Sequence, residues 1–169
     1  MKELDPAEVT QRYCDWLNDP QVNQFLESRF QIATLDTVRA FVRAMLKDPA
    51  NILFAIRLQE SGRHIGNIKL GPIDRQQRRA EVGLVVGEED CRGKGYASEA
   101  LALVVDYAFA ELGLHKLTAG CYEPNTASVA LFTGCGFAVD GIRKRHCWYQ
   151  GTYVDAVLFG LFNPREEEG

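Results

Sequence analysis

The sequence predicts an α+β protein with a mixed central sheet flanked by helices. Helical patterns occupy the beginning of the chain, three strand-like segments follow one another directly, and helices then alternate with strands. This order is typical of an α+β mixed sheet. The length of 169 residues, with 46% hydrophobic and 25% charged residues, fits one soluble domain with a substantial core, which we expect to span residues 1–169.

The N-terminal part of the chain is expected to be helical. A helix is predicted over Ala7–Asn18, with Asp5 as N-cap and Pro6 at the first helical position. Val22–Glu27 is predicted to form a short helical turn, and Leu35–Lys47 a second helix. The apolar residues of the second helix recur at helical spacing and are expected to face the core: Leu35, Val38, Phe41, Val42, Met45 and Leu46.

The remaining segments alternate between strand and helix patterns. Strands are predicted over Ile52–Gln59, His64–Gly71, Ala80–Val86, Lys116–Tyr122, Phe137–Ile142 and Tyr153–Phe162. The first three of these are expected to pair antiparallel, with Glu60–Arg63 as a hairpin connection. One helix is predicted over Ser98–Leu112, ending at Gly113, and another opens at Asn125–Ser128 and ends near Gly134–Gly136.

A glycine-rich turn follows the strand at Ala80–Val86 and has the chemistry of a phosphate site. The turn, Arg92-Gly-Lys-Gly-Tyr-Ala97, opens the next helix. Glycines at a helix start let backbone N–H groups approach a ligand closely, and the free amides at the positive helix end favour phosphate. Arg92 and Lys94 add positive charge. The alternative interpretation is an ordinary helix entry with solvated basic residues.

The spacing of this turn distinguishes between phosphate-binding motifs. A Walker loop would need G-x-x-x-x-G-K-[ST], and a dinucleotide fingerprint would need a glycine where Ser98 stands. Arg92-Gly-Lys-Gly95-Tyr-Ala97 instead resembles the R/Q-x-x-G-x-G/A pyrophosphate loop of the GCN5-related N-acetyltransferases, the GNAT family. Asn125-x-x-Ser128 followed by Gly136-Phe137 resembles the family's N-x-x-S/A…G-F signature. Tyr153-x-Asp155 resembles a closing pattern of the branch typified by the ribosomal-protein acetyltransferases RimJ and RimL.

The resemblance extends over nearly the whole chain and implies the GNAT acyltransferase fold, with acetyl-CoA as co-substrate. The family normally opens with a strand, for which only Met1–Leu4 are present here, so we expect that strand to be short, absent or trimmed. By resemblance, backbone groups of three residues pair with the pantetheine arm: Leu84, Val85 and Val86. The pyrophosphate is held by Arg92, Gly93, Lys94, Gly95, Tyr96 and Ala97. Asn125 contacts the cofactor arm, or serves only as a helix N-cap.

Two residues are candidates for the general base in acetyl transfer to an amine. Period-2 alternation places Glu81 on the same strand face as Gly83 and Val85, close to where the acetyl group would lie. The alternative is that Glu81 is merely a polar residue at the end of a strand. His146 is the competitor, because an unperturbed imidazole suits proton transfer near neutral pH.

The proton donor for the departing thiolate is a point where the sequence differs from the family. Many members carry a tyrosine in the pattern N-x-x-A-x-x-L-Y, and Phe132 occupies that position here. Phenylalanine has no proton to give. Ser128 lies four residues earlier on the same helix face and is the candidate donor, or it is a small residue that helps to close the helix start. The remaining possibility is a protein that binds acetyl-CoA without catalysis.

The run from Thr10 to Phe30, together with Arg145-His146 and Tyr153-x-Asp155, resembles family members that acetylate amino sugars on nucleotide carriers. The resemblance implies a small primary amine as acceptor, preferably such an amino sugar. Arg143–Thr152 is interpreted as a connection rich in groups that can bind an acceptor. Its basic residues Arg143–Arg145 either pair with a nucleotide diphosphate or form a solvated loop. The alternative acceptor is a protein N-terminus, as for the ribosomal-protein acetyltransferases.

Composition excludes several other partners. The net charge of −4 argues against a general nucleic-acid surface. No apolar run approaches the roughly 18 residues of a membrane span, and the N-terminus does not have the pattern of a signal peptide. Five cysteines without a C-x-x-C pair indicate reduced thiols, no metal site and a cytoplasmic protein. A homodimer is one possible assembly.

Overall fold

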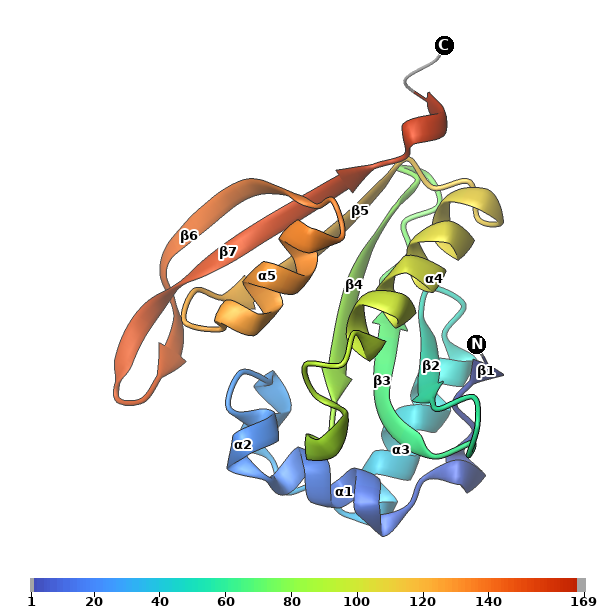
Figure 1. The fold of residues 1–169 in the computed structure, drawn as a ribbon, viewed down its shortest axis with the longest axis vertical. Coiled ribbons are helices and arrows are strands. Elements are labelled where there is room, and N and C mark those ends of the chain that lie inside the picture. The colour runs from blue at the N-terminus through green and yellow to red at the C-terminus, as the bar shows by residue number, and fades with distance from the viewer. Residues whose placement is uncertain (1, 167–169) are drawn as a thin grey trace.

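The computed structural model describes residues 2–166 and confirms the α+β fold with a mixed sheet (Figure 1). In this part of the chain, seven strands form one sheet in the order β1-β2-β3-β4-β5-β7-β6. All neighbouring strands are antiparallel except β4 and β5, which are parallel. The strands are β1 (Lys2–Glu3), β2 (Ile52–Arg57), β3 (His64–Leu70), β4 (Arg79–Val86), β5 (Lys116–Tyr122), β6 (Ala138–Tyr149) and β7 (Thr152–Phe162).

Helices cover both faces of the sheet. The α-helices are α1 (Gln11–Asn18), α2 (Pro20–Asn23), α3 (Leu35–Lys47), α4 (Tyr96–Ala110) and α5 (Thr126–Gly134). Short 3₁₀ helices are η1 (Pro6–Glu8), η2 (Glu27–Phe30), η3 (Glu89–Cys91) and η4 (Pro164–Glu166). Alternate residues of β2 reveal the two layers, because Phe54 and Ile56 pack in the cluster with α4, whereas Leu53 and Ala55 pack with α1 and α3.

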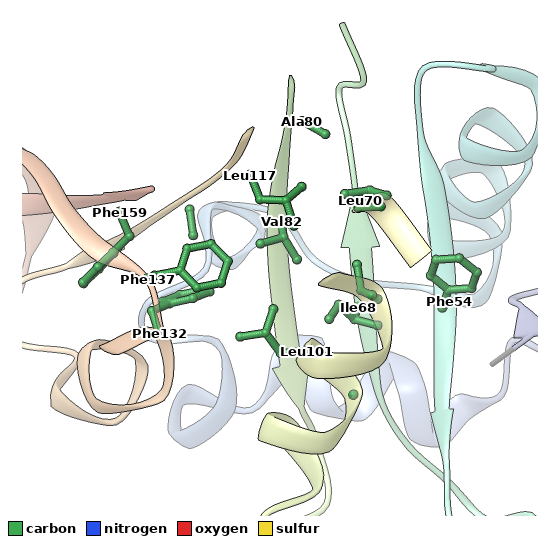
Figure 2. Close-up of a cluster of buried hydrophobic side chains, with 14 of the residues drawn as sticks. Phe54, Ile68, Leu70, Ala80, Val82, Leu101, Leu117, Phe132, Phe137 and Phe159 are labelled. Carbon is green, nitrogen blue, oxygen red and sulfur yellow. The ribbon is translucent and has the colours of Figure 1, made fainter. Parts of the chain in front are cut away.

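The larger core lies between the sheet and the helices α4 and α5. Figure 2 shows Leu101 of α4 next to Val82 of the central strand β4. At the far end of the same cluster, the ring of Phe132 from α5 lies 5.4 Å from the ring of Phe137 and 5.4 Å from that of Phe159 (Figure 2). Burial of these apolar side chains fixes α4 and α5 on the sheet.

The parallel pair β4–β5 is short, and the two strands separate after it (Figure 1). Their pairing joins Arg79–Glu81 to Lys116–Thr118 only. On its other edge, β4 stays paired with β3 as far as Val86. The edge of β4 that faces β5 is therefore open from Val82 onward, and its backbone groups are available to another extended chain.

The structure corrects three expectations about the N-terminal part. The predicted helix Ala7–Asn18 is divided into η1 and α1, because Val9 is buried in an extended conformation and Thr10 provides a second N-cap. The expected turn at Val22–Glu27 is divided between α2 and η2. The boundaries Leu35–Lys47 are confirmed, but Phe41 and Leu46, expected in the core, are 44% and 45% exposed.

The ends of the sheet also differ from the expectation. A first strand is present as the two-residue β1, which pairs with β2, while Met1 lies outside the described residues. The segment Arg143–Thr152 was predicted to be a connection, and this is wrong, because β6 continues to Tyr149. Two register shifts disrupt the alternation of β6. Gln150 and Gly151 then form a tight hairpin turn with φ values of 46° and 82°.

Helix α1 is fastened to the turn after β4 by a buried carboxylate. Glu88, 7% exposed, accepts hydrogen bonds from Arg12 Nε at 2.6 Å, Arg12 Nη2 at 3.1 Å and Trp16 Nε1 at 2.8 Å. The backbone at Gly87 also packs directly against the ring of Trp16. A Cβ on Gly87 would lie only 2.0 Å from Trp16 Cδ2, so a larger residue would not fit there. The hydrogen bonds from Arg12 lower the pKa of Glu88 below its ordinary value.

Glu88→Gln is expected to lower the free energy of unfolding by about 1–3 kcal/mol at neutral pH, because the new amide nitrogen cannot accept from Arg12. The folded-state pKa of Glu88 lies below the ordinary 4.5. The contribution of the Glu88 carboxylate to the free energy of unfolding is therefore complete above about pH 4.5. This contribution is lost as the pH falls through the folded-state pKa. Urea denaturation at neutral pH and near pH 3 measures both effects. The exposed neighbour variant Glu89→Gln is the control, and a stability difference that does not narrow in acid would contradict the assignment.

Candidate active site

A cleft of about 900 Å³ opens where β4 and β5 separate. Its walls come from the strands β2 to β7, from the helices α1, α3 and α5, and from the segment between α1 and α3. On β4, Glu81, Gly83 and Val85 share one sheet face and all line the cleft, as the alternation predicts. The early end of β4–β5 pairing thus opens a deep concave site along β4.

The three residues predicted for catalysis line this cleft together. Glu81 comes from β4, Ser128 from α5 and His146 from β6. Glu81 and His146 are exposed, whereas Ser128 is half-buried. The chain thus brings residues that are far apart in sequence to one cleft that holds a carboxylate, an imidazole and a hydroxyl. Each of these groups can take part in proton transfer.

The start of α5 is capped by a residue of the motif. The Oδ1 atom of Asn125 accepts a hydrogen bond from the Ser128 backbone N–H at 3.2 Å. Asn125 is therefore the helix N-cap, and it also lines the cleft, so the two interpretations are compatible. Phe132 lines the cleft as well, with 4% exposure, and its ring is held between Phe137 and Phe159.

The glycine-rich turn forms the N-terminus of α4, beside the open end of β4. Helix α4 begins at Tyr96, two residues before the predicted start at Ser98. Gly93 and Gly95 have φ values of 69° and 86°, in the left-handed region, and a Cβ on either would meet nothing within 4 Å. Gly95 is the N-cap and provides no side-chain hydrogen bond to the first turn. The backbone N–H groups of this turn are thus accessible to an anion.

The cleft and the turn divide the predicted cofactor-binding residues between them. Leu84 and Val85 line the cleft, whereas Val86 does not. The six residues of the turn lie outside the cleft lining: Arg92, Gly93, Lys94, Gly95, Tyr96 and Ala97. Of these, the Arg92 guanidinium donates from Nη2 to the carbonyl of Gly87 at 3.2 Å, which ties the turn to the end of β4.

An aromatic and ionic wall, whose contacts the sequence did not predict, closes the cleft on the side of β5. The hydroxyl of Tyr122 donates to the Glu27 carboxylate and accepts from Arg29 Nη1 at 3.0 Å. Arg29 Nη2 also donates to the carbonyl of Trp148 at 2.7 Å. Burial and the hydrogen bond to Glu27 raise the pKa of Tyr122. The wall joins η2 to the β6–β7 hairpin.

Two further lining residues were missed, and a signal for them existed. Asn67 and Lys69 lie on β3, on the face of the sheet that carries Glu81 and Gly83, and both line the cleft. They are polar residues at positions i and i+2 of a strand that is otherwise largely apolar. Such alternation could have identified the cleft-facing side of β3.

Comparison with known proteins agrees with this geometry. Residues 2–138 match the family model described as acetyltransferase (GNAT) domain. The chain is 30% identical to the protein named uncharacterized N-acetyltransferase p20 of Bacillus licheniformis, over 99% of this chain and 92% of that protein. It is 31% identical to spermidine N(1)-acetyltransferase of Escherichia coli, over 60% of this chain and 54% of that one.

Among solved structures, the fold is similar to that of spermidine N-acetyltransferase from Vibrio cholerae, determined in complex with CoA and spermine. The TM-score is 0.84 at 21% identity, with 96% of this chain and 94% of that chain covered. The fold and the cleft define a GNAT acyltransferase, and the chain belongs to the GNAT family. It is an N-acetyltransferase that uses acetyl-CoA as co-substrate.

The comparisons do not confirm the expected branch of the family. These relatives are named as spermidine or other N-acetyltransferases, so the RimJ and RimL branch is not confirmed. All five cysteines lie within the described residues and are free thiols. Over residues 2–166, no helix has the length and apolar character needed to cross a membrane.

Proposed function

We propose that this enzyme acetylates a small primary amine in the cleft between β4 and β5. The observation that carries the proposal is that Glu81, Ser128 and His146, from three different elements, line one cleft along the open edge of β4. The enzyme family and acetyl-CoA follow from the comparisons, whereas the roles of individual residues and the acceptor are inferences from this arrangement.

The residues present fit acetyl-CoA. The unpaired edge at Leu84–Val86 can add the pantetheine amides as an extra strand. The turn from Arg92 to Ala97 can hold the pyrophosphate through free backbone N–H groups, with open space at Gly93 and Gly95. Asn125, at the start of α5, lines the cleft and can contact the cofactor arm there.

In the proposed reaction, Glu81 takes a proton from the acceptor ammonium, and His146 is the alternative base. The free amine nitrogen attacks the thioester carbonyl, the new C–N bond forms, and the C–S bond breaks. The departing sulfur takes the electron pair of that bond and receives a proton from the hydroxyl of Ser128. The nitrogen releases its second proton as the amide forms, and this proton restores the Ser128 hydroxyl. Because Phe132 is buried and has no acidic proton, Ser128 is the proposed donor.

The preferred acceptor in this proposal is an amino sugar on a nucleotide carrier. Arg143 lines the cleft, and its guanidinium can pair with a diphosphate. Lys144 instead forms an ion pair with Asp155, with its Nζ 2.7 Å from Asp155 Oδ2. A polyamine is the second candidate, favoured by the names of the relatives. Release of CoA thiol with a panel of amines, including a protein N-terminal peptide, tests these acceptors, and the absence of release with every amine would overturn the proposed function.

Gly95→Val is expected to abolish acetyl-CoA binding, because a branched side chain at a φ of 86° blocks a phosphate and disfavours the turn. Titration calorimetry measures the binding, and circular dichroism confirms folding. Gly113→Val is the matched control, since Gly113 at the other end of α4 also has a positive φ, 60°, and open space. A folded Gly95→Val protein that binds acetyl-CoA like the native protein would refute the assignment of the turn.

Glu81→Gln is expected to lower turnover about 10²–10⁴-fold while changing acetyl-CoA binding far less, because the amide cannot take the proton. Steady-state rates over a range of pH, with a saturating acceptor, measure the effect. His146→Gln is compared in parallel. A loss of only a few-fold in Glu81→Gln, with an unmoved pH profile, would transfer the role of base to His146.

Ser128→Ala is expected to fold, to bind acetyl-CoA and to transfer acetyl at least about tenfold more slowly, a loss of about 1.4 kcal/mol of transition-state stabilisation. Thr133→Ala, which removes an exposed hydroxyl from the same helix, is the control. Phe132→Tyr in the Ser128→Ala background is expected to restore part of the rate. Native turnover in Ser128→Ala would leave water as the proton source.

A further inference from the structure

We propose that the acceptor amine carries an anionic group, a carboxylate or a phosphate, that is bound by the side chains of Asn67 and Lys69 on β3. This inference rests on the proposed function and adds a substrate class to it. It is carried by hydrogen-bond donors on one wall of the cleft that lack acceptors within the described residues.

Asn67 is a buried polar residue whose side-chain amide nitrogen, Nδ2, has no hydrogen-bond acceptor within the described residues. It is 3% exposed and lines the cleft. Buried polar groups are nearly always paired, so the Nδ2 donor of this lining residue is available to a water or a bound molecule.

His64 determines which end of the Asn67 amide is free. Its Nε2 atom lies 2.9 Å from the carbonyl oxygen of Gly66 and 3.0 Å from Asn67 Oδ1. Because a carbonyl oxygen only accepts, Nε2 carries the proton and donates to both oxygens. Burial lowers the pKa of His64, which favours this neutral imidazole. The Oδ1 of Asn67 is therefore occupied, and the group left for a ligand is a donor.

Lys69 adds a positive charge two residues along the same face. Its register partner on β4 is Gly83, which has no side chain, and a Cβ there would meet nothing within 4 Å. No carboxylate of residues 2–166 forms an ion pair with it. The next residue on that face of β4 is Glu81, the proposed base, so Lys69 lies one diagonal position from Glu81 in the sheet.

The other acidic residues of the cleft do not balance this charge. Glu27 accepts from Tyr122, and Asp140 pairs with Lys116. The wall made by Asn67 and Lys69 thus presents only donors, one of them charged, beside the proposed base. This pattern complements a carboxylate or phosphate oxygen. A polyamine, which is cationic at every nitrogen, would instead face a like charge at Lys69.

The test compares acceptors that differ only in the anionic group. The pairs are 4-aminobutyrate with butylamine, O-phosphoethanolamine with ethanolamine, and glucosamine 1-phosphate with glucosamine, and spermidine represents the polycations. The kcat/KM of the native enzyme is expected to be at least about tenfold higher for the anionic member of one or more pairs. The carboxylate and phosphate pairs separate the two chemical sources of the anion.

Lys69→Met keeps the apolar stem and removes the charge, and it is expected to reduce the anionic-to-neutral ratio of kcat/KM at least about tenfold. Asn67→Leu is expected to reduce it in the same direction, and Lys69→Glu to reverse it. Lys47→Met, at the exposed end of α3 and outside the cleft lining, is the matched control and should leave the ratio unchanged.

A native preference for butylamine or spermidine, or a ratio that Lys69→Met leaves unchanged, would overturn the anion site while the proposed acetyl transfer stands. If the enzyme acetylates no amine, the proposed function fails. In that case, calorimetry measures the binding of 4-acetamidobutyrate to the enzyme–CoA complex, which tests the anion site without catalysis. Binding that weakens at least about tenfold in Lys69→Met supports the anion site, and equal binding in the native and variant proteins overturns it.

Discussion

The early end of the pairing between β4 and β5 is the constraint on which the site depends. After Glu81 and Thr118, the two strands no longer share hydrogen bonds. Separation exposes the backbone edge of β4 and leaves room for a cleft of about 900 Å³. A continuous parallel ladder would satisfy those backbone groups and fill the space with side chains. The fold therefore leaves part of its sheet unpaired so that a bound molecule can complete it.

Two polar contacts hold the separated halves of the sheet. Glu88 attaches α1 to the turn that leads into α4, and Tyr122 attaches η2 to the strand β5 through Glu27 and Arg29. Both involve buried or partly buried charges that are paired by hydrogen bonds, which is the condition under which such charges are tolerated. The N-terminal segment thus bridges the opening instead of covering one half only.

The distribution of charge around the cleft bears on substrate choice. The relatives of this chain include enzymes named for spermidine, but similarity at about 30% identity does not transfer an acceptor. In this chain, Lys69 and the amide of Asn67 stand beside the proposed base, and the nearby carboxylates other than Glu81 have partners of their own. We propose that these few polar residues set the acceptor preference on a scaffold shared with the relatives.

The sequence by itself determined the fold class, most element boundaries and the glycine-rich turn, because these follow from local periodicity and local backbone chemistry. The predicted bounds of α3 and β5 agree with the structure, and Gly93 and Gly95 have the positive φ values that favour glycine. The tertiary structure alone decided the break before α1, the length of β6 and the wall of the cleft. Tyr122 and Glu27 are 95 residues apart in the chain, and Asn67 meets the cleft only through the register of β3 on β4. Such contacts depend on how strands align and where they separate, which no local pattern encodes.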